Sequence, residues 1–165
     1  MSNVYWIKTG DQAPAAEVSS AARRLLEVLT EREGASLERE IPLKVHFGER
    51  GNETWVRPDC FDGIIDLLEE RGVKSSFMET SVLYGGPRAR RGSHEQLARE
   101  HGFTRLPVVI ADGEAGESFA EVQIDKKHFK SCKIGAEFAK YRQLLVLSHF
   151  KGHRLAGFGG ALKQL

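Results

Sequence analysis

The stretch Pro42-Leu43-Lys44-Val45-His46-Phe47-Gly48 decides the fold of this chain. Its side chains alternate in character and it ends on a glycine, a pattern that predicts a β-strand. Arg57-Pro58-Asp59 then predicts the start of a helix, because proline suits the first turn and aspartate faces the positive end of the helix dipole. The helix stops near Gly72. Its buried stripe has apolar residues at helical spacing, namely Phe61, Ile64, Ile65 and Leu68.

Further strands and helices are predicted on both sides of this unit. Apolar or alternating runs predict strands at 4–7, 75–80, 107–111 and 144–147. Helical spacing predicts helices from Ala15 to about Arg32 and through Glu100, the second opening on a capping box of Ser93 with Gln96. His94 and His101 are expected to be surface residues of this second, short helix. Strand patterns at 119–124 and 129–134, followed by a helical turn at 136–141, interrupt the alternation of strands and helices. We therefore expect a single α/β domain over residues 1–165, three-layered and Rossmann-like, with a mostly parallel sheet and a small β-insertion near 112–135.

Composition excludes several classes of protein. The formal net charge is +1, from 24 basic and 23 acidic residues, so no global charge favours binding to nucleic acid. No apolar run approaches the roughly 20 residues of a membrane-spanning helix. Cys60 and Cys132 are far apart and are expected to be reduced thiols. These features predict a soluble, cytoplasmic protein that binds neither nucleic acid nor membranes.

Two of the predicted strands lead into loops with charged residues and glycine. The loop 46–54 contains His46, Gly48, Arg50 and Asn52 ahead of a helix start, where backbone amides suit an anionic group. A solvated turn is an equally good interpretation of that loop. The loop 79–92 contains Arg88, Arg90 and Arg91, which could bind a phosphate or carboxylate. Arginines in a loop are more often simply solvated, so this second signal is the weaker of the two.

The strongest functional signal is the segment 148–163, which follows the apolar strand at 144–147. His149, Lys151 and His153 alternate there, so either an extended or a helical backbone brings the two imidazoles near each other. Imidazoles in proximity suit proton transfer or metal binding. Glycines allow close approach of the backbone to a ligand. The remaining candidate ligand-binding residues of this segment are Gly157, Gly159, Gly160 and Lys163.

Several segments together resemble one family. These are 44–52, Arg57-Pro58, 107–113, 148–153 and 156–163. They resemble the uncharacterised iron–sulfur centre proteins, also called domain of unknown function 362. The resemblance implies a longer protein with a ferredoxin-like cysteine region, so the chain is expected to be an N-terminal fragment. Cys60 and Cys132 cannot supply a four-cysteine cluster, and no iron–sulfur cluster is expected in this chain.

A second, fainter resemblance concerns the end of the chain. His153, Ala156-Gly157-Phe158, Gly160 and Lys163 are similar to a segment of nickel-dependent lactate racemase. That resemblance implies an acid–base role for His153 and a cofactor-anchoring role for Lys163. Thr80-Ser81 lacks the second histidine that the racemase pattern has at this place.

Three functional hypotheses follow. The leading one is a domain that binds a small anionic or nucleotide-like ligand between the Gly48–Thr54 loop and the 148–163 segment. In it His46, His149 and His153 are polar or acid–base groups, and Lys151 and Lys163 neutralise the anion. The second is a metal-binding or redox module built on His149 and His153 with His46. The third is a non-catalytic assembly domain for a ferredoxin-like region, with a homodimer as one form of assembly. The sequence identifies no cofactor and leaves open whether the protein is an enzyme.

Overall fold

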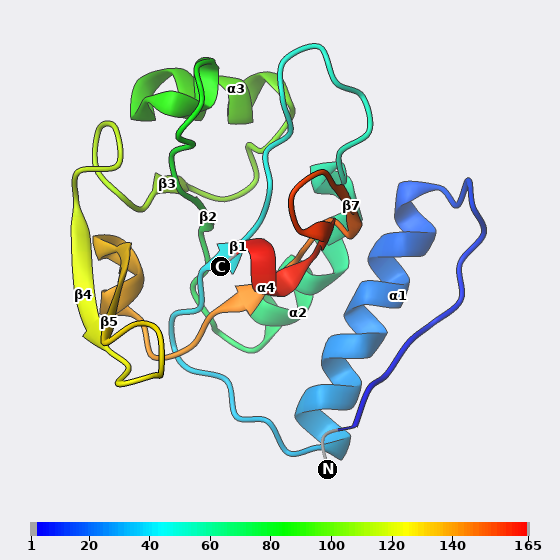
Figure 1. Cartoon of the computed structure of the whole chain (residues 1–165). Helices are drawn as coiled ribbons and strands as arrows, with labels where there is room; N and C mark the ends of the chain where they lie inside the picture. Colours follow the sequence, from blue (N-terminus) through cyan, green and yellow to red (C-terminus); the bar gives the residue numbers. More distant parts are fainter. Residues whose placement is uncertain (1–2, 165) are drawn as a thin grey trace.

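A parallel β-sheet forms the centre of the molecule. In the computed structural model, which describes residues 3–164, its strands are β1 (Leu43–Lys44), β2 (Phe77–Glu79), β3 (Val108–Ile110) and β6 (Leu145–Val146) (Figure 1). Their order is β3-β2-β1-β6, and every neighbouring pair is parallel. A mixed α/β fold with a parallel sheet is therefore confirmed, and each strand lies within a segment predicted as a strand. The three-layer, Rossmann-like arrangement remains a prediction.

Helices make the two crossovers between the first three strands. A 3-10 turn, η2 (Pro58–Phe61), leads into α2 (Asp62–Glu70), with proline in the first turn as predicted. The helix ends at Glu70, and Gly72, shortly after it, has a φ of 70° that favours glycine. Between β2 and β3, the turn η3 (Pro87–Ala89) leads into α3 (Arg91–Glu100).

The predicted capping box of α3 is wrong. The helix begins at Arg91, so Ser93 lies inside it rather than at its N-cap. The Ser93 hydroxyl donates to the carbonyl oxygens of Pro87 and Arg90, at 2.5 and 3.1 Å. The Gln96 amide donates to Glu100 at 2.8 Å, one turn further along the helix.

The long N-terminal helix packs against α2. It comprises α1 (Ala15–Glu27) and a π-helical turn, η1 (Val28–Arg32), and so matches the predicted extent. The amide of Gly63 donates to the Ser19 hydroxyl at 2.7 Å. A Cβ at Gly63 would lie 2.5 Å from the Ser19 carbonyl oxygen, so this contact requires glycine.

The predicted strand at 4–7 is wrong. These residues form no strand, and Val4 and Trp6 are 87% and 77% exposed. An apolar run predicts a strand only where a sheet edge is available to pair with it and bury it. Figure 1 shows this segment running along the outside of α1, away from the sheet.

An aromatic cluster fills the core between the sheet and the helices. Phe103 lies at its centre, edge-on to Phe47 and Phe77 with ring centroids 4.9 and 5.2 Å away. All three side chains are fully buried. The apolar stripe predicted for α2 is buried on the same core, as Ile64, Ile65 and Leu68 have at most 5% exposure.

The predicted β-insertion is confirmed as an antiparallel hairpin. It consists of β4 (Phe119–Gln123) and β5 (Ser131–Gly135), followed by a 3-10 turn, η4 (Ala136–Lys140). Figure 1 shows the hairpin and α1 on opposite sides of the molecule. A Cβ at Gly135 would lie 2.9 Å from the Ala111 carbonyl oxygen, so the insertion packs closely against the end of β3.

The C-terminal segment is a second small hairpin rather than an irregular loop. After β6 come β7 (Lys151–His153) and β8 (Gly157–Gly159), which pair antiparallel, and the short helix α4 (Ala161–Gln164). The Gln164 side chain donates to the Lys44 carbonyl oxygen at 3.4 Å, which ties this segment to β1. Within residues 3–164, no helix is long and apolar enough to cross a membrane.

Candidate functional site

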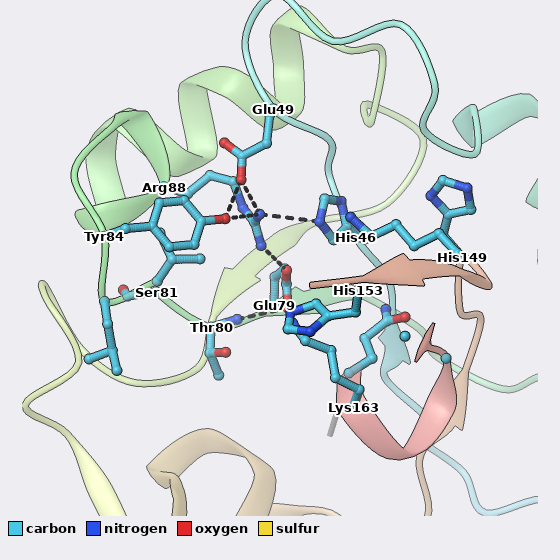
Figure 2. Close-up of a pocket in the computed structure, with 16 residues that line it drawn as sticks. His46, Glu49, Glu79, Thr80, Ser81, Tyr84, Arg88, His149, His153 and Lys163 are labelled. Carbon is cyan, nitrogen blue, oxygen red and sulfur yellow. Dashed lines mark hydrogen bonds and ion pairs between the residues drawn. The ribbon is translucent and has the colours of Figure 1, made fainter. Parts of the chain in front are cut away.

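A cavity of about 420 Å³ opens at the C-terminal ends of β1, β2 and β6 (Figure 2). These ends meet at one edge because the strands are parallel, and open α/β sheets bind ligands at this edge. The segment after β1 contributes His46 and Glu49. The end of β2 and its loop contribute Glu79, Thr80, Ser81, Tyr84 and Arg88. The C-terminal segment forms the opposite wall with His149, Lys151, His153, Gly159, Gly160 and Lys163.

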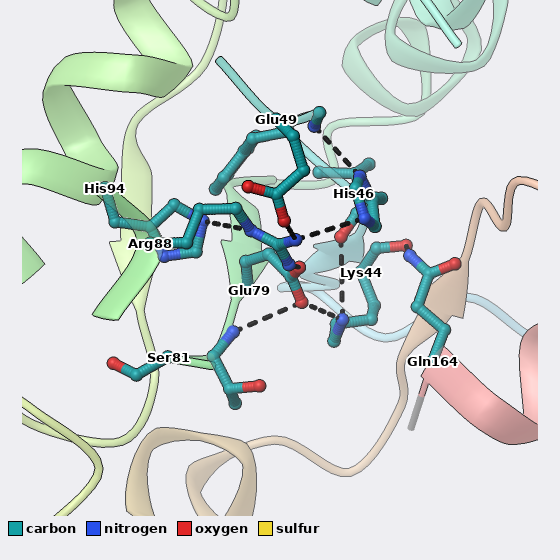
Figure 3. A network of polar contacts seen from close by, with 12 residues as sticks. Lys44, His46, Glu49, Glu79, Ser81, Arg88, His94 and Gln164 are labelled. Carbon is teal, nitrogen blue, oxygen red and sulfur yellow. Dashed lines mark hydrogen bonds and ion pairs between the residues drawn. The ribbon is translucent and has the colours of Figure 1, made fainter. Parts of the chain in front are cut away.

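Arg88 is the centre of a buried polar network in one wall of the cavity (Figure 3). Arg88 is only 4% exposed. The guanidinium donates to Glu79 Oε2 at 2.6 Å and to Glu49 Oε1 at 2.5 Å. Its Nε also donates to His94 Nε2 at 3.3 Å. A single arginine therefore holds together side chains from three separate segments of the chain.

Glu79 connects this network to a buried lysine in the sheet. One carboxylate oxygen of Glu79 is paired with Arg88, and the other is paired with Lys44 Nζ. The backbone amide of Thr80 also donates to Glu79 Oε1, at 3.2 Å. Burial lowers the pKa of Lys44, an effect that the Glu79 carboxylate opposes.

Glu49 completes the network at the cavity surface. Its Oε1 accepts from Arg88 and from the Tyr84 hydroxyl, both at 2.5 Å. Burial raises the pKa of Glu49, but the hydrogen bonds from Tyr84 and Arg88 outweigh burial and bring the pKa below its usual value. The four charges of Lys44, Arg88, Glu49 and Glu79 therefore balance: two cations face two carboxylates.

His46 lies between this network and the C-terminal wall. Its Nδ1 accepts from the Gly48 amide at 2.9 Å, and its Nε2 is 3.2 Å from Arg88 Nη1. Burial, followed by the positive charges of Arg88 and Lys151, lowers the pKa of His46 to about 3. The ring is therefore neutral at physiological pH.

His94 was predicted as a surface residue of its helix, and this was wrong. It is fully buried, edge-on to Phe47 with ring centroids 5.4 Å apart. Burial and the charge of Arg88 lower its pKa to about 4. Its Nδ1 has no hydrogen-bond partner among the described residues, so the burial of this ring is incompletely compensated. The surface prediction failed because α3 packs on the core with the face that carries His94.

His101, also predicted as a surface residue, is only partly exposed. It stacks on Trp55 with ring centroids 4.5 Å apart, and its Nδ1 lies 2.7 Å from the Phe47 carbonyl oxygen. The two rings pack against the backbone of the loop after β1 at Gly48.

The C-terminal wall carries positive charge that the network does not balance. Lys151 and Lys163 both line the cavity. Neither forms an ion pair with any side chain in residues 3–164. Burial, together with the nearby charge of Lys151, lowers the pKa of His149, so this ring too is neutral at physiological pH. The cavity, taken together with the Lys44 side chain paired behind it, therefore has an excess of two positive charges among the described residues.

Most of the residues predicted for the site do meet at this cavity, but some do not. His46, His149, Lys151, His153, Gly159, Gly160 and Lys163 line it. Gly48, Arg50, Asn52 and Gly157 are not among its lining residues. Arg50 pairs with Glu100 at 2.8 Å, and the Asn52 side chain accepts from the amide and hydroxyl of Thr54. Gly157 has a φ of 75° at the turn between β7 and β8.

Sequence reasoning missed the acidic and buried half of the site. Arg88 was noted only as one of three loop arginines, and Lys44, Glu49, Glu79 and Tyr84 were not singled out. A usable signal was present, because Lys44 and Glu79 are opposite charges within two of the predicted strands. Charged residues are rarely buried unless they are paired, so two such residues in neighbouring strands suggest an ion pair.

The described residues contain no evident metal centre. Within residues 3–164, no group of three or more His, Cys, Asp or Glu side chains is arranged to hold a metal ion. His46, His149 and His153 share the cavity without forming such a group.

The backbone at Gly48 sets the position of His46 and leads to a prediction. Gly48 has a φ of 85°, and a Cβ there would lie 2.7 Å from Trp55 Cγ and 2.9 Å from His101 Nδ1. Gly51 has a similar φ of 80° but has open space around it. We expect Gly51→Ala to lower the free energy of unfolding by about 1 kcal/mol from backbone strain alone. Gly48→Ala should cost roughly 2–3 kcal/mol, because the clash adds to the same strain. Urea unfolding of both variants measures the difference. If both lower the free energy of unfolding equally, the stacked Trp55 and His101 rings move aside without an energetic cost, and the prediction based on the clash is wrong.

Comparison with known proteins identifies one family. Residues 41–165 match the family model described as Domain of unknown function (DUF362). The match begins shortly before β1 and includes every residue that lines the cavity. No curated protein and no solved structure matches the chain. Since the matched segment covers most of its residues, the chain belongs to the DUF362 family.

Proposed function

We propose that this protein binds a small anionic ligand in the cavity at the C-terminal edge of its sheet. The observation that carries the proposal is the uncompensated charge of Lys151 and Lys163. Lys44 and Arg88 are already balanced by Glu49 and Glu79, so the two remaining lysines have no acidic partner among residues 3–164. Both lysines are exposed residues that line the cavity, and an anion inside the cavity is screened less than at an open surface.

The size of the cavity favours a small ligand. Its volume of about 420 Å³ is at the lower end of the range for small-molecule pockets, roughly 300–1,000 Å³. A phosphate, a small carboxylate or a small phosphate ester fits this volume. Of the two ligand types that the sequence suggested, the small anion is therefore preferred to a whole nucleotide.

Removal of the two lysines tests the proposal. The charge-neutral variant Lys151→Gln/Lys163→Gln is expected to bind inorganic phosphate at least about tenfold more weakly than the unchanged protein, because two favourable charge interactions are lost. Isothermal titration calorimetry at low ionic strength is the suitable measurement, since salt screens these interactions.

The matched control is Lys126→Gln/Lys127→Gln, which removes the same charge from the exposed turn of the β4–β5 hairpin. It should bind phosphate as the unchanged protein does. If both double variants weaken binding equally, the effect is one of overall charge and the proposed site is wrong. If phosphate, sulfate, acetate and small phosphate esters all fail to bind the unchanged protein, the proposed function itself is wrong.

A proton-transfer role for His149 and His153 is a further part of this proposal. His149 is neutral at physiological pH, as a proton acceptor must be, and both rings line the cavity that would hold the ligand. The resemblance to nickel-dependent lactate racemase supports the same role for His153 and an anion-holding role for Lys163. No observation in residues 3–164 favours the metal-binding alternative.

A further inference from the structure

The hydrogen bonds of His46 place two donors on one imidazole ring. The Gly48 amide, which can only donate, lies 2.9 Å from Nδ1. On the other side, Arg88 Nη1 lies 3.2 Å from Nε2, and a guanidinium can also only donate. A neutral imidazole has one acceptor nitrogen and one N–H, so it cannot accept at both positions.

The Gly48 contact decides which nitrogen carries the proton. With Nδ1 accepting from Gly48, the proton of the neutral ring is on Nε2. The Nε2–H and Arg88 Nη1 then face each other across 3.2 Å, and neither can accept from the other. Arg88 Nη1 has other acceptors, Glu49 Oε1 at 2.5 Å and the Tyr84 hydroxyl at 3.3 Å, so His46 Nε2–H is the donor left without one. His46 is partly buried, and a donor without an acceptor is costly in such a position. An acceptor placed beside both groups would remove this cost.

Within the described network, no carboxylate oxygen is hydrogen-bonded to the His46 ring. Glu49 Oε1 accepts from Arg88 and Tyr84, and Glu79 accepts from Arg88, Lys44 and the Thr80 amide. The cavity, by contrast, reaches His46 and Arg88 and continues to Lys151 and Lys163. The missing acceptor is therefore best supplied by whatever occupies the cavity.

We infer that His46 and Arg88 form one end of an oxyanion site, in which one unprotonated ligand oxygen accepts from His46 Nε2–H beside the positive charge of the Arg88 guanidinium. Lys151 and Lys163 contact the other oxygens of the same group. Donors on opposite walls and two uncompensated charges suit a tetrahedral dianion, such as phosphate or the phosphoryl group of a small ester. A carboxylate has one charge and two coplanar oxygens, so it neutralises only one of the two charges and contacts fewer of the donors. This inference rests on the proposed function and specifies the ligand and a residue role within it.

Nitrogen NMR of the histidine rings tests the role of His46 directly. The full chain is labelled with ¹⁵N-histidine, and the His46 signal is assigned by comparison with a His46 variant. At pH 7 we expect the neutral Nε2–H form of His46, and we expect its ring signals to shift on titration with inorganic phosphate. An Nδ1–H or doubly protonated ring, or a ring signal unchanged at saturating phosphate, would overturn the inference.

Two substitutions separate the ligand contact from the local structural role. In His46→Asn, the amide oxygen replaces Nδ1 and keeps the hydrogen bond to Gly48, but no donor reaches the position of Nε2. In His46→Gln, the amide N–H₂ lies near the position of Nε2 and keeps the donor. We expect Asn to weaken phosphate binding by about tenfold or more, and Gln to restore most of that loss, because a hydrogen bond to a charged group is at stake.

The outcomes distinguish this inference from the proposed function. Thermal melting of each variant verifies that it is folded before its affinity is compared. If the Lys151/Lys163 variant loses phosphate binding while both His46 variants keep it, the anion site stands and the role of His46 is wrong. Acetate binding as tightly as phosphate or sulfate would overturn the dianion specificity. Absence of any anion binding to the unchanged protein removes both proposals.

Discussion

Substitution of Arg88 by methionine is expected to lower the free energy of unfolding by about 3–5 kcal/mol, the usual cost of breaking a buried ion pair by removing one partner. The arginine side chain is 5% exposed and joins Glu79 and Glu49, so its loss leaves carboxylates that are buried or partly buried without their main counter-charge. His94 Nε2 also loses its donor. Chemical denaturation at neutral pH measures this change.

A matched substitution on the surface provides the control. Arg50 pairs with Glu100, but the two side chains are 57% and 41% exposed. Arg50→Met should therefore cost at most about 1 kcal/mol. Arg88→Lys should fall between the two, because lysine keeps the charge but cannot contact both carboxylates and a histidine from one rigid, planar group. If Arg88→Met costs no more than Arg50→Met, the network does not stabilise the fold as argued.

Truncation of Phe103 to alanine should have an effect of similar size, about 3–5 kcal/mol. Its ring is fully buried at the centre of the aromatic cluster, between Phe47 and Phe77 and close to Trp55 and Phe61. Removal leaves a cavity that rigid neighbouring rings on both the sheet and the helix side cannot readily fill.

Phe129→Ala is the control for this second substitution. Phe129 is 70% exposed near the end of the β4–β5 hairpin, and its truncation should change the free energy of unfolding by no more than about 0.5 kcal/mol. Urea unfolding of the two variants in parallel is the measurement. Similar small losses for both would mean that the core collapses around the missing Phe103 ring.

Local patterns predicted most of the fold because they depend on short-range physics. The strands at β1, β2, β3 and β6, the β4–β5 hairpin and the helices at 15–32 and near 58–72 were all recognisable from periodicity, proline and glycine. Two predictions of local structure failed. The apolar run at 4–7 pairs with no strand of the sheet, and the Ser93 hydroxyl donates to the Pro87 carbonyl oxygen instead of capping the helix. An apolar run or a hydroxyl only predicts a preference, and packing decides whether the preference is used.

The cationic wall of the site was also predictable, since His149, Lys151, His153 and Lys163 are close in sequence after one strand. The sequence did not predict which residues of the 46–54 loop reach the cavity. His46 and Glu49 do, whereas Arg50 and Asn52 are engaged elsewhere. The direction of each side chain depends on the positive φ values at Gly48 and Gly51, which a sequence pattern does not specify.

The sequence by itself thus determined an α/β fold with a parallel sheet, and a glycine-rich segment of histidines and lysines after the strand at 144–147. Only the tertiary structure decided that Arg88 and Glu79, nine residues apart along the chain, join Lys44 and Glu49 in one buried network. The physical reason is that opposite charges are buried together only when the strands that carry them are already paired, and that pairing depends on contacts distant in sequence. The same network neutralises its own charges, and so leaves the excess positive charge of the cavity to Lys151 and Lys163.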